Sequence, residues 1–175
     1  MVKQYKIRNN TWTRRTKLVI TKILLFFLGR GFQTIAKIDP EVAKEINTWD
    51  DNFTIMFEIL PDGPYMSLAK QNNQLKYLGF KKVDAHLTIG FKNLEAAFLI
   101  FTAQKSTPIG YAEHRLYVKG DLALAMSLIR CLNIVQFYLF PGFIAKKILK
   151  RMPSMSIKKF GIRLYTYLIG IPLGL

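Results

Sequence analysis

The chain reads Leu116-Tyr117-Val118-Lys119-Gly120-Asp121-Leu122-Ala123-Leu124-Ala125-Met126-Ser127-Leu128 at the point where a strand pattern gives way to a helix pattern. The residues from Arg115 to Lys119 predict a short strand that ends at Gly120. Asp121 can then accept hydrogen bonds from the first free N–H groups of a helix. We expect that helix to extend from Leu122 to about Phe140. It is apolar except for one narrow polar stripe, made of Ser127, Arg130, Asn133 and Gln136. Such a helix is either enclosed by protein or lines apolar space.

Upstream of this stretch, apolar and polar residues alternate as they do in half-buried strands. Three strands are predicted, at residues 53–59, 65–71 and 74–80. Pro61-Asp62-Gly63-Pro64 separates the first two, and Asn72-Asn73 separates the second and third. Both separators are typical turn sequences. The three strands should therefore form an antiparallel meander.

Between the meander and the opening stretch, the pattern predicts a fourth strand over residues 83–91. Its polar face would carry Asp84, His86 and Thr88, and is expected to be solvated. Asn93 can cap a following helix from about Leu94 to Gln104, and Ser106 to Gly110 should break it. Before the meander, Asp39-Pro40 should begin a short helix that ends near Trp49.

The order helix, meander, strand, helix, strand and long apolar helix resembles the sterol carrier protein 2 family, which comprises small lipid-binding domains. The stretch 116–128 carries the likeness, residues 84–94 support it, and it covers about 41–140. One departure is His114-Arg115, which stands where the family usually has a glycine before its last strand. The basic ends resemble membrane-associated bacterial members, such as the accessory lipid-binding factor of ubiquinone biosynthesis.

The resemblance implies an α+β fold in which a five-stranded, mostly antiparallel sheet and its covering helices enclose an apolar tunnel. Burying a lipid chain there would contribute roughly 0.8 kcal/mol per methylene. Close packing of the same side chains in a solid core is the alternative. The residues expected to line the tunnel are Phe53, Ile55, Phe57, Phe98, Phe101, Met126, Leu128, Leu132 and Phe137.

Positive charge is concentrated at the two ends of this 175-residue chain, whose formal net charge is +15. Residues 1–37 contain nine Lys and Arg and no acid, residues 141–175 contain seven and no acid, and the span between is nearly neutral. Both ends also carry apolar runs, at residues 18–28 and 164–175. Basic residues interleaved with Leu, Ile and Phe are typical of segments that bind anionic membranes.

We divide the chain into a basic amphipathic helix at 1–38, a sterol-carrier-like lipid-binding domain at 39–140, and basic amphipathic helices at 141–175. The first helix should be solvated at its start and buried at its end. Either its own domain or a membrane or partner could bury that end, and we expect the second. The residues expected to bind the membrane are Arg14, Arg15, Lys17, Lys22, Leu24, Phe27, Lys146, Lys147, Lys150, Lys158 and Lys159.

No window reaches the roughly 18 to 20 uninterrupted apolar residues of a membrane-spanning helix. The region after Leu28 reads Gly29-Arg30-Gly31-Phe32, which lacks the small-residue pattern of a signal-peptide cleavage site. We therefore expect a retained anchor and a peripheral protein. The single cysteine, Cys131, lies in an apolar run, which favours a buried thiol in a reducing compartment and so the cytoplasmic side of the membrane.

The residues that carry chemistry are few and scattered. The two histidines, His86 and His114, and Cys131 show no metal-ligand spacing, and no glycine-rich phosphate loop follows a strand. We expect no enzymatic activity, no metal and no cofactor other than a bound lipid. Nucleic acid is not expected as a partner, because the basic ends are paired with aliphatic runs instead of stacking aromatic residues.

These observations predict a peripheral membrane protein that holds or transfers a hydrophobic ligand. The ligand classes left open are a sterol-like lipid, an isoprenoid quinone or its precursor, and a fatty-acyl chain. The alternative is a non-catalytic accessory or assembly subunit of a membrane protein complex, which keeps the fold without transferring a ligand. The expected partners are thus an anionic membrane surface, a lipid or isoprenoid and, in the alternative, a membrane protein complex.

Overall fold

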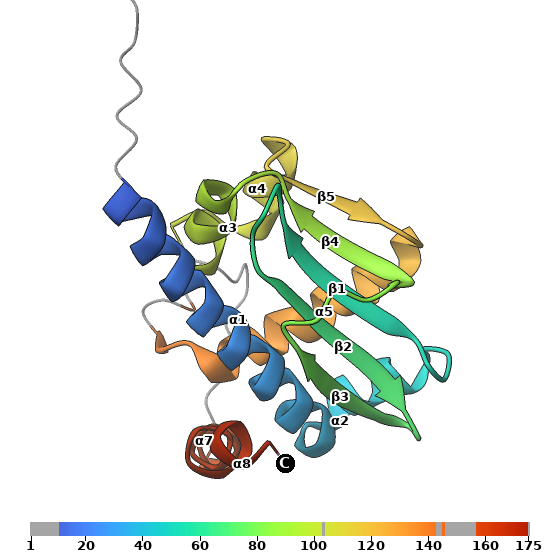
Figure 1. Ribbon diagram of the computed structural model, residues 1–175. Helices are drawn as coiled ribbons and strands as arrows, with labels where there is room; N and C mark the ends of the chain where they lie inside the picture. The colour runs from blue at the N-terminus through green and yellow to red at the C-terminus, as the bar shows by residue number, and fades with distance from the viewer. Residues whose placement is uncertain (1–10, 103, 143–144, 146–156, 175) are drawn as a thin grey trace, which may run out of the picture.

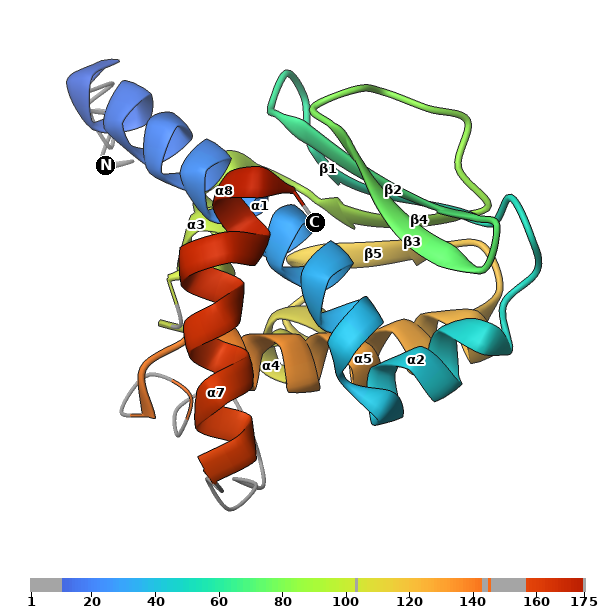
Figure 2. The ribbon, with the colours of Figure 1, turned by 90° about the horizontal axis from the view of Figure 1, so that it is seen from below.

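The computed structural model describes residues 11–102, 104–142, 145 and 157–174. Its centre is a five-stranded sheet with the strand order β3-β2-β1-β4-β5, and helices cover one face of it (Figures 1 and 2). The strands are β1 (Thr54–Ile59), β2 (Tyr65–Gln71), β3 (Gln74–Gly79), β4 (Leu87–Phe91) and β5 (Leu116–Lys119). The predicted α+β fold class is confirmed.

The helices that the structure describes come from both ends of the chain as well as from its middle. They are α1 (Thr11–Ile38), α2 (Pro40–Asn47), α3 (Leu94–Phe101), α4 (Thr107–Ala112), α5 (Leu122–Leu139), α7 (Ile157–Tyr165), the π-helix η1 (Thr166–Gly170) and α8 (Ile171–Leu173). The side chains of Asp39, Asn93 and Asp121 accept hydrogen bonds from backbone N–H groups of the first turns of α2, α3 and α5. The caps predicted at Asn93 and Asp121 are therefore confirmed, as is the predicted start of a helix at Asp39-Pro40.

Three of the four strand pairings are antiparallel. The strands β1, β2 and β3 form the predicted meander, and β5 is antiparallel to β4. The remaining pair, β1 with β4, is parallel. Asn72 and Asn73 both have positive φ, at 52° and 59°, as the predicted two-residue turn between β2 and β3 requires.

The segment between β3 and β4 joins an edge strand to a strand beyond the meander, and it crosses the sheet on the face opposite the helices (Figure 2). Ser67 donates to the carbonyl oxygen of Lys81 at 2.6 Å, and the hydroxyl of Thr54 lies 2.8 Å from Nδ1 of His86. The predicted fourth strand from residue 83 was too long, since β4 begins only at Leu87. Thr88 was also wrongly assigned to a solvated face, because it is 4% exposed.

The backbone conformation explains the two residues His114 and Gly120, which flank β5. His114 has a φ of 54°, a left-handed conformation that glycine adopts most easily and that histidine tolerates better than most residues. Gly120 has a φ of 122°, and a Cβ there would lie 2.3 Å from the carbonyl oxygen of His86.

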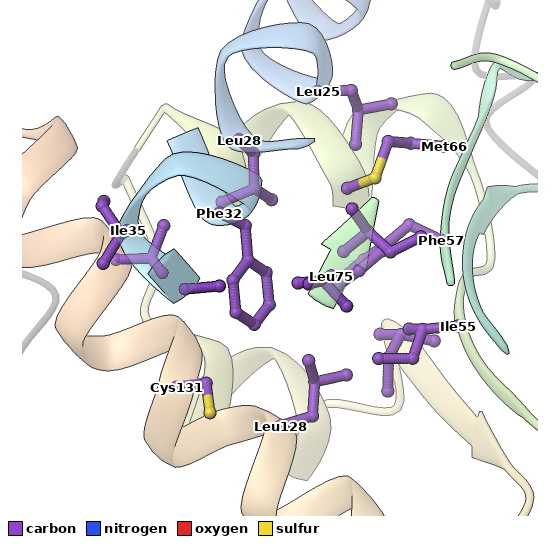
Figure 3. Packing of buried hydrophobic residues seen from close by; sticks show 14 of the residues in the cluster. Leu25, Leu28, Phe32, Ile35, Ile55, Phe57, Met66, Leu75, Leu128 and Cys131 are labelled. Carbon is purple, nitrogen blue, oxygen red and sulfur yellow. The ribbon is translucent and has the colours of Figure 1, made fainter. Parts of the chain in front are cut away.

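The second half of α1 lies in the centre of the core. Leu25, Leu28, Phe32 and Ile35 are at most 6% exposed. Figure 3 shows these side chains facing Phe57, Met66 and Leu75 of the sheet and Leu128 and Cys131 of α5. The expectation that a membrane or partner buries this end of the helix was wrong. The protein's own sheet and α5 bury it, because a long helix with apolar residues on most sides can fill the space between two layers.

The region after α3 is more helical than predicted. The helix expected to reach Gln104 ends at Phe101, and α4 occupies residues that were expected only to break it. Pro108 lies in the first turn of α4, where its missing N–H removes no helical hydrogen bond. The proline therefore begins a helix here.

The C-terminal helices α7, η1 and α8 lie across α1 and the end of α5 (Figure 2). Their inner side is held by Ile162, Thr166 and Ile171, which are at most 8% exposed. The described helices near both ends of the chain thus join the hydrophobic core. The helix predicted over 143–152, with Lys146, Lys147 and Lys150, lies outside the described residues apart from Ala145.

Candidate functional site

The nine residues predicted to line a tunnel have different surroundings among the residues that the structure describes. Phe53, Ile55, Phe57, Leu128 and Phe137 are at most 4% exposed and belong to the close-packed core. Leu132 and Phe98 are partly buried. Met126 is 50% exposed, so its assignment to the interior was wrong. The physical reason is that α1 occupies the space between the sheet and α5, which directs the interior side chains against α1.

An apolar pocket of about 270 Å³ lies instead where α1, α3, the end of α5 and η1 meet. Phe101 is the one predicted tunnel residue that lines it, and Leu24 and Phe27, predicted to bind a membrane, line it as well. The residues that sequence reasoning missed are Ile23, Leu28, Ile100, Gln136, Leu139, Phe140 and Tyr167. Gln136 is the only amide of this lining, and Tyr167 carries its only hydroxyl.

The exposure of the lining residues shows which part of the pocket faces outward. Ile23 is 50% exposed, Tyr167 39% and Phe27 37%. Leu28, Ile100, Phe101 and Leu139 are each at most 8% exposed. The first three therefore form the rim, and the others form the floor against the core. A sequence signal for the rim existed, because Ile23 and Phe27 are one helical turn apart on the side of α1 away from Leu25 and Phe32.

Arg163 of α7 fastens the C-terminal wall of the pocket to α5. Its guanidinium donates to the carbonyl oxygens of Phe137 at 2.5 Å, Phe140 at 3.0 Å and Tyr138 at 3.1 Å. The last carbonyl groups of a helix have no partner within the helix and lie at the negative end of its dipole. A cation from another helix therefore both satisfies these groups and joins α7 to α5.

Tyr167 adds a second link at the same place. Its hydroxyl donates to the carbonyl oxygen of Leu139, which also lines the pocket. Burial raises the pKa of this phenol, although the nearby Arg163 opposes the shift. The neutral phenol thus forms part of the pocket wall without placing a charge in it.

The predicted membrane-binding residues of α1 have different surroundings. Arg14, Arg15 and Lys22 are exposed. Lys17 instead pairs with Glu95 of α3, and its ammonium lies 5.4 Å from the ring centre of Phe98.

The corresponding residues of α7 are described only in part. Lys159 lies over the ring of Phe137, with Nζ 5.8 Å from the ring centre. Lys158 lies in α7, but the structure does not describe its side chain.

Another group of polar contacts joins α2 to α5. Glu45 of α2 accepts from Arg130 Nε at 2.7 Å and Nη2 at 2.8 Å, and Ser127 Oγ donates to it at 2.7 Å. The hydrogen bond from Arg130 is the largest cause that lowers the pKa of Glu45 to about 2. Among the described residues, no group of three or more His, Cys, Asp or Glu lies close enough to hold a metal ion.

No protein-family model and no curated protein matches the chain. Among solved structures, it is similar to one titled "UbiJ-SCP2 Ubiquinone synthesis protein", with 14% identity, a TM-score of 0.42, and coverage of 71% of this chain and 98% of the other. It is also similar to the sterol carrier protein domain 2 of Helicoverpa armigera, with 15% identity, a TM-score of 0.38, and coverage of 71% and 87%. These titles name the family that the sequence resembles. At these identities and TM-scores, the likeness adds nothing about ligand or partner.

Proposed function

We propose that this protein is a non-catalytic, peripheral membrane protein that holds the apolar chain of a lipid in the pocket between α1, α3, α5 and η1. The observation that carries the proposal is an apolar pocket whose rim is open while its floor is the protein core. Every lining residue is aliphatic or aromatic except Gln136. The burial of hydrocarbon against such a lining is favourable, and the lining has no charge that would bind a polar metabolite.

The size of the pocket limits how much of a ligand it takes. Its volume of about 270 Å³ lies just below the roughly 300 to 1,000 Å³ of typical small-molecule pockets. One acyl or isoprenoid chain, or one end of a sterol-like lipid, suits that volume better than a complete phospholipid. The headgroup would stay outside the rim, in reach of a membrane or of a partner enzyme that receives the lipid.

A position on the membrane surface is favoured over a position across it. Two described helical segments, Thr13–Ile38 and Leu122–Leu139, are long and apolar enough to span a bilayer. Half of the first window and 44% of the second are buried inside the protein, however. Spanning would expose the sheet face that α1 and α5 cover, including residues such as Phe57 and Leu75 that are now at most 2% exposed.

The test is the binding of a fluorescent fatty acid in detergent-free buffer, with Ile23→Trp as the blocking variant. The larger side chain at the rim should fill the mouth and weaken binding at least about tenfold, while leaving the core intact. Val19→Trp is the matched control, because Val19 lies one turn earlier, is 54% exposed and does not line the pocket. Equal binding by both variants and the wild type would exclude this pocket as the site.

Native mass spectrometry of protein extracted under mild conditions provides the second measurement. A co-purifying lipid that Ile23→Trp lacks would support the proposal and identify the ligand class. Wild-type protein that carries no lipid and binds no fatty acid would refute it. That result would favour the accessory subunit of a membrane protein complex.

A further inference from the structure

Two helices from opposite ends of the chain expose strips of large apolar side chains. On α1 the strip is Val19, Ile23 and Phe27, which are 54%, 50% and 37% exposed. On α7 and η1 it is Phe160, Leu164 and Leu168, which are 57%, 50% and 66% exposed. Within each strip the residues are four apart, and therefore lie along one side of their helix. We call them the α1 strip and the α7 strip.

The α1 strip and the helix that carries the α7 strip meet at the pocket. Phe27 of the α1 strip and Tyr167, which directly precedes Leu168, line the same pocket. Farther along, Gln33 Nε2 donates to the carbonyl oxygen of Gly174 at 2.5 Å, and Gly170 packs against the side chain of Thr34. The C-terminal helices are thus fixed against α1 (Figure 2).

The buried side of the C-terminal helices sets the direction of the α7 strip. Ile162 and Thr166 are at most 8% exposed and face the body of the protein. Phe160, Leu164 and Leu168 lie two residues away from these positions, which is roughly the opposite side of the helix. The α7 strip therefore points away from the core into the surroundings, where water is a poor partner for it.

The charges beside the strips indicate what covers them. Arg14, Arg15 and Lys22 are exposed on α1, and residues 1–37 contain no acid. Glu95 of α3, which contacts this part of α1, is already paired with Lys17. A surface of apolar residues flanked by cations complements an anionic bilayer, whose lipids supply both hydrocarbon and negative charge.

We infer that the α1 strip and the α7 strip together rest in one anionic lipid leaflet, with the mouth of the pocket facing the membrane between them. This inference rests on the proposed function and adds the orientation of the protein and the role of the C-terminal helices. A lipid chain then passes from the leaflet into the pocket without crossing water. The sequence assigned membrane binding at this end to lysines, whereas the exposed side chains that can enter the leaflet are Phe160, Leu164 and Leu168.

Co-sedimentation with phosphatidylcholine vesicles, with and without phosphatidylglycerol, tests the surface. Leu168→Gln and Val19→Gln should each weaken binding to the anionic vesicles about tenfold, because each removes an apolar side chain from the leaflet. Leu122→Gln is the matched control: Leu122 is 64% exposed, as Leu168 is 66%, but lies at the far end of α5. Equal effects of Leu122→Gln and Leu168→Gln, or equal binding to both kinds of vesicle, would overturn the inference.

Insertion itself is measured with Leu164→Trp and vesicles that contain brominated lipids. Bromine quenches a tryptophan only within the hydrocarbon region, so Leu164→Trp should be quenched and Leu122→Trp should show only the quenching of the wild type. An unquenched Leu164→Trp would contradict insertion and favour a protein partner on this strip.

The fatty-acid assay in buffer separates this inference from the proposed function. Val19→Gln and Leu168→Gln lie outside the pocket lining and should bind the fatty acid as the wild type does. Lost vesicle binding with retained fatty-acid binding supports the orientation. Normal fatty-acid binding by protein that binds no vesicles would refute membrane attachment, and with it the orientation, but would leave the pocket in place. Vesicle binding without fatty-acid binding would refute only the pocket.

Discussion

Tyr138 of α5 donates a hydrogen bond from its hydroxyl to Oδ2 of Asp39 at 2.8 Å, and both residues are buried. The other carboxylate oxygen of Asp39 caps α2, where it accepts from the backbone N–H groups of Glu41 at 2.9 Å and Val42 at 3.3 Å. One carboxylate therefore fixes the start of α2 to the end of α5.

Removal of the Tyr138 hydroxyl should be costly because Oδ2 of Asp39 would stay buried without this partner. We expect Tyr138→Phe to lower the free energy of unfolding by roughly 1 to 3 kcal/mol. Urea denaturation measures the change. Tyr111→Phe, at a tyrosine that is 55% exposed on α4, should leave the unfolding midpoint within error, and a similar loss in both variants would argue against a role for this bond.

The contact of Glu45 with Arg130 and Ser127 predicts a loss of stability in acid. The folded pKa of about 2 lies below the ordinary value of 4.5, so the ionised carboxylate stabilises the folded state. This stabilisation is present above about pH 4.5 and is lost as the pH falls towards 2. Glu45→Gln should flatten the dependence in that window and cost about 1 kcal/mol at neutral pH, since the pair is partly exposed.

Denaturation midpoints across the acid range test this expectation. Asp62→Asn, in the exposed turn between β1 and β2, is the control. Its denaturation midpoint should depend on pH as that of the wild type does. An unchanged slope in Glu45→Gln would show that other carboxylates govern acid unfolding.

Replacing Gly90 and Gly161 with alanine should change the free energy of unfolding in opposite directions. At Gly90 a Cβ would lie 2.0 Å from Cζ of Tyr117, whose hydroxyl donates to Glu58 at 2.5 Å. Gly90→Ala should displace this ring and cost roughly 1 to 3 kcal/mol. At Gly161 of α7 a Cβ meets nothing within 4 Å, so Gly161→Ala should stabilise the helix by roughly 0.5 to 1 kcal/mol. Urea denaturation measures the free energy of unfolding of both variants. Destabilisation by Gly161→Ala would contradict the described α7.

Cys131 should be inert in the folded protein. Its side chain is fully buried, and burial raises the pKa of the thiol to about 12. The reactive thiolate is therefore nearly absent at neutral pH. Iodoacetamide should label the protein only after guanidinium chloride is added, as mass spectrometry would show. Labelling of the folded protein at the rate of free cysteine would mean that α5 does not pack against α1 as described.

The strands and capped helices followed from the sequence because local patterns determine them. Asp39, Asn93 and Asp121 mark helix starts through bonds to neighbouring residues, and Asn72-Asn73 specifies a turn by its own backbone preference. The parallel pairing of β1 and β4 also agrees with the long connection between them.

The pocket could not be predicted in the same way, because long-range packing creates it. Periodicity places Ile23 and Phe32 on different sides of α1, but both sides are apolar, and the sequence does not show which of them the sheet and α5 cover. The outward position of Met126 has the same origin. On a helix that is apolar on nearly every side, only the neighbouring elements decide which side faces water.

The burial of Leu25, Phe32 and Ile35 changes how a deletion of the first 38 residues must be read. Such a truncation would remove the middle of the hydrophobic interior rather than a detachable tail. A truncated protein that failed to reach membranes would therefore have lost its fold. At this end of the chain, only single substitutions on the outer side of α1 can report on membrane attachment.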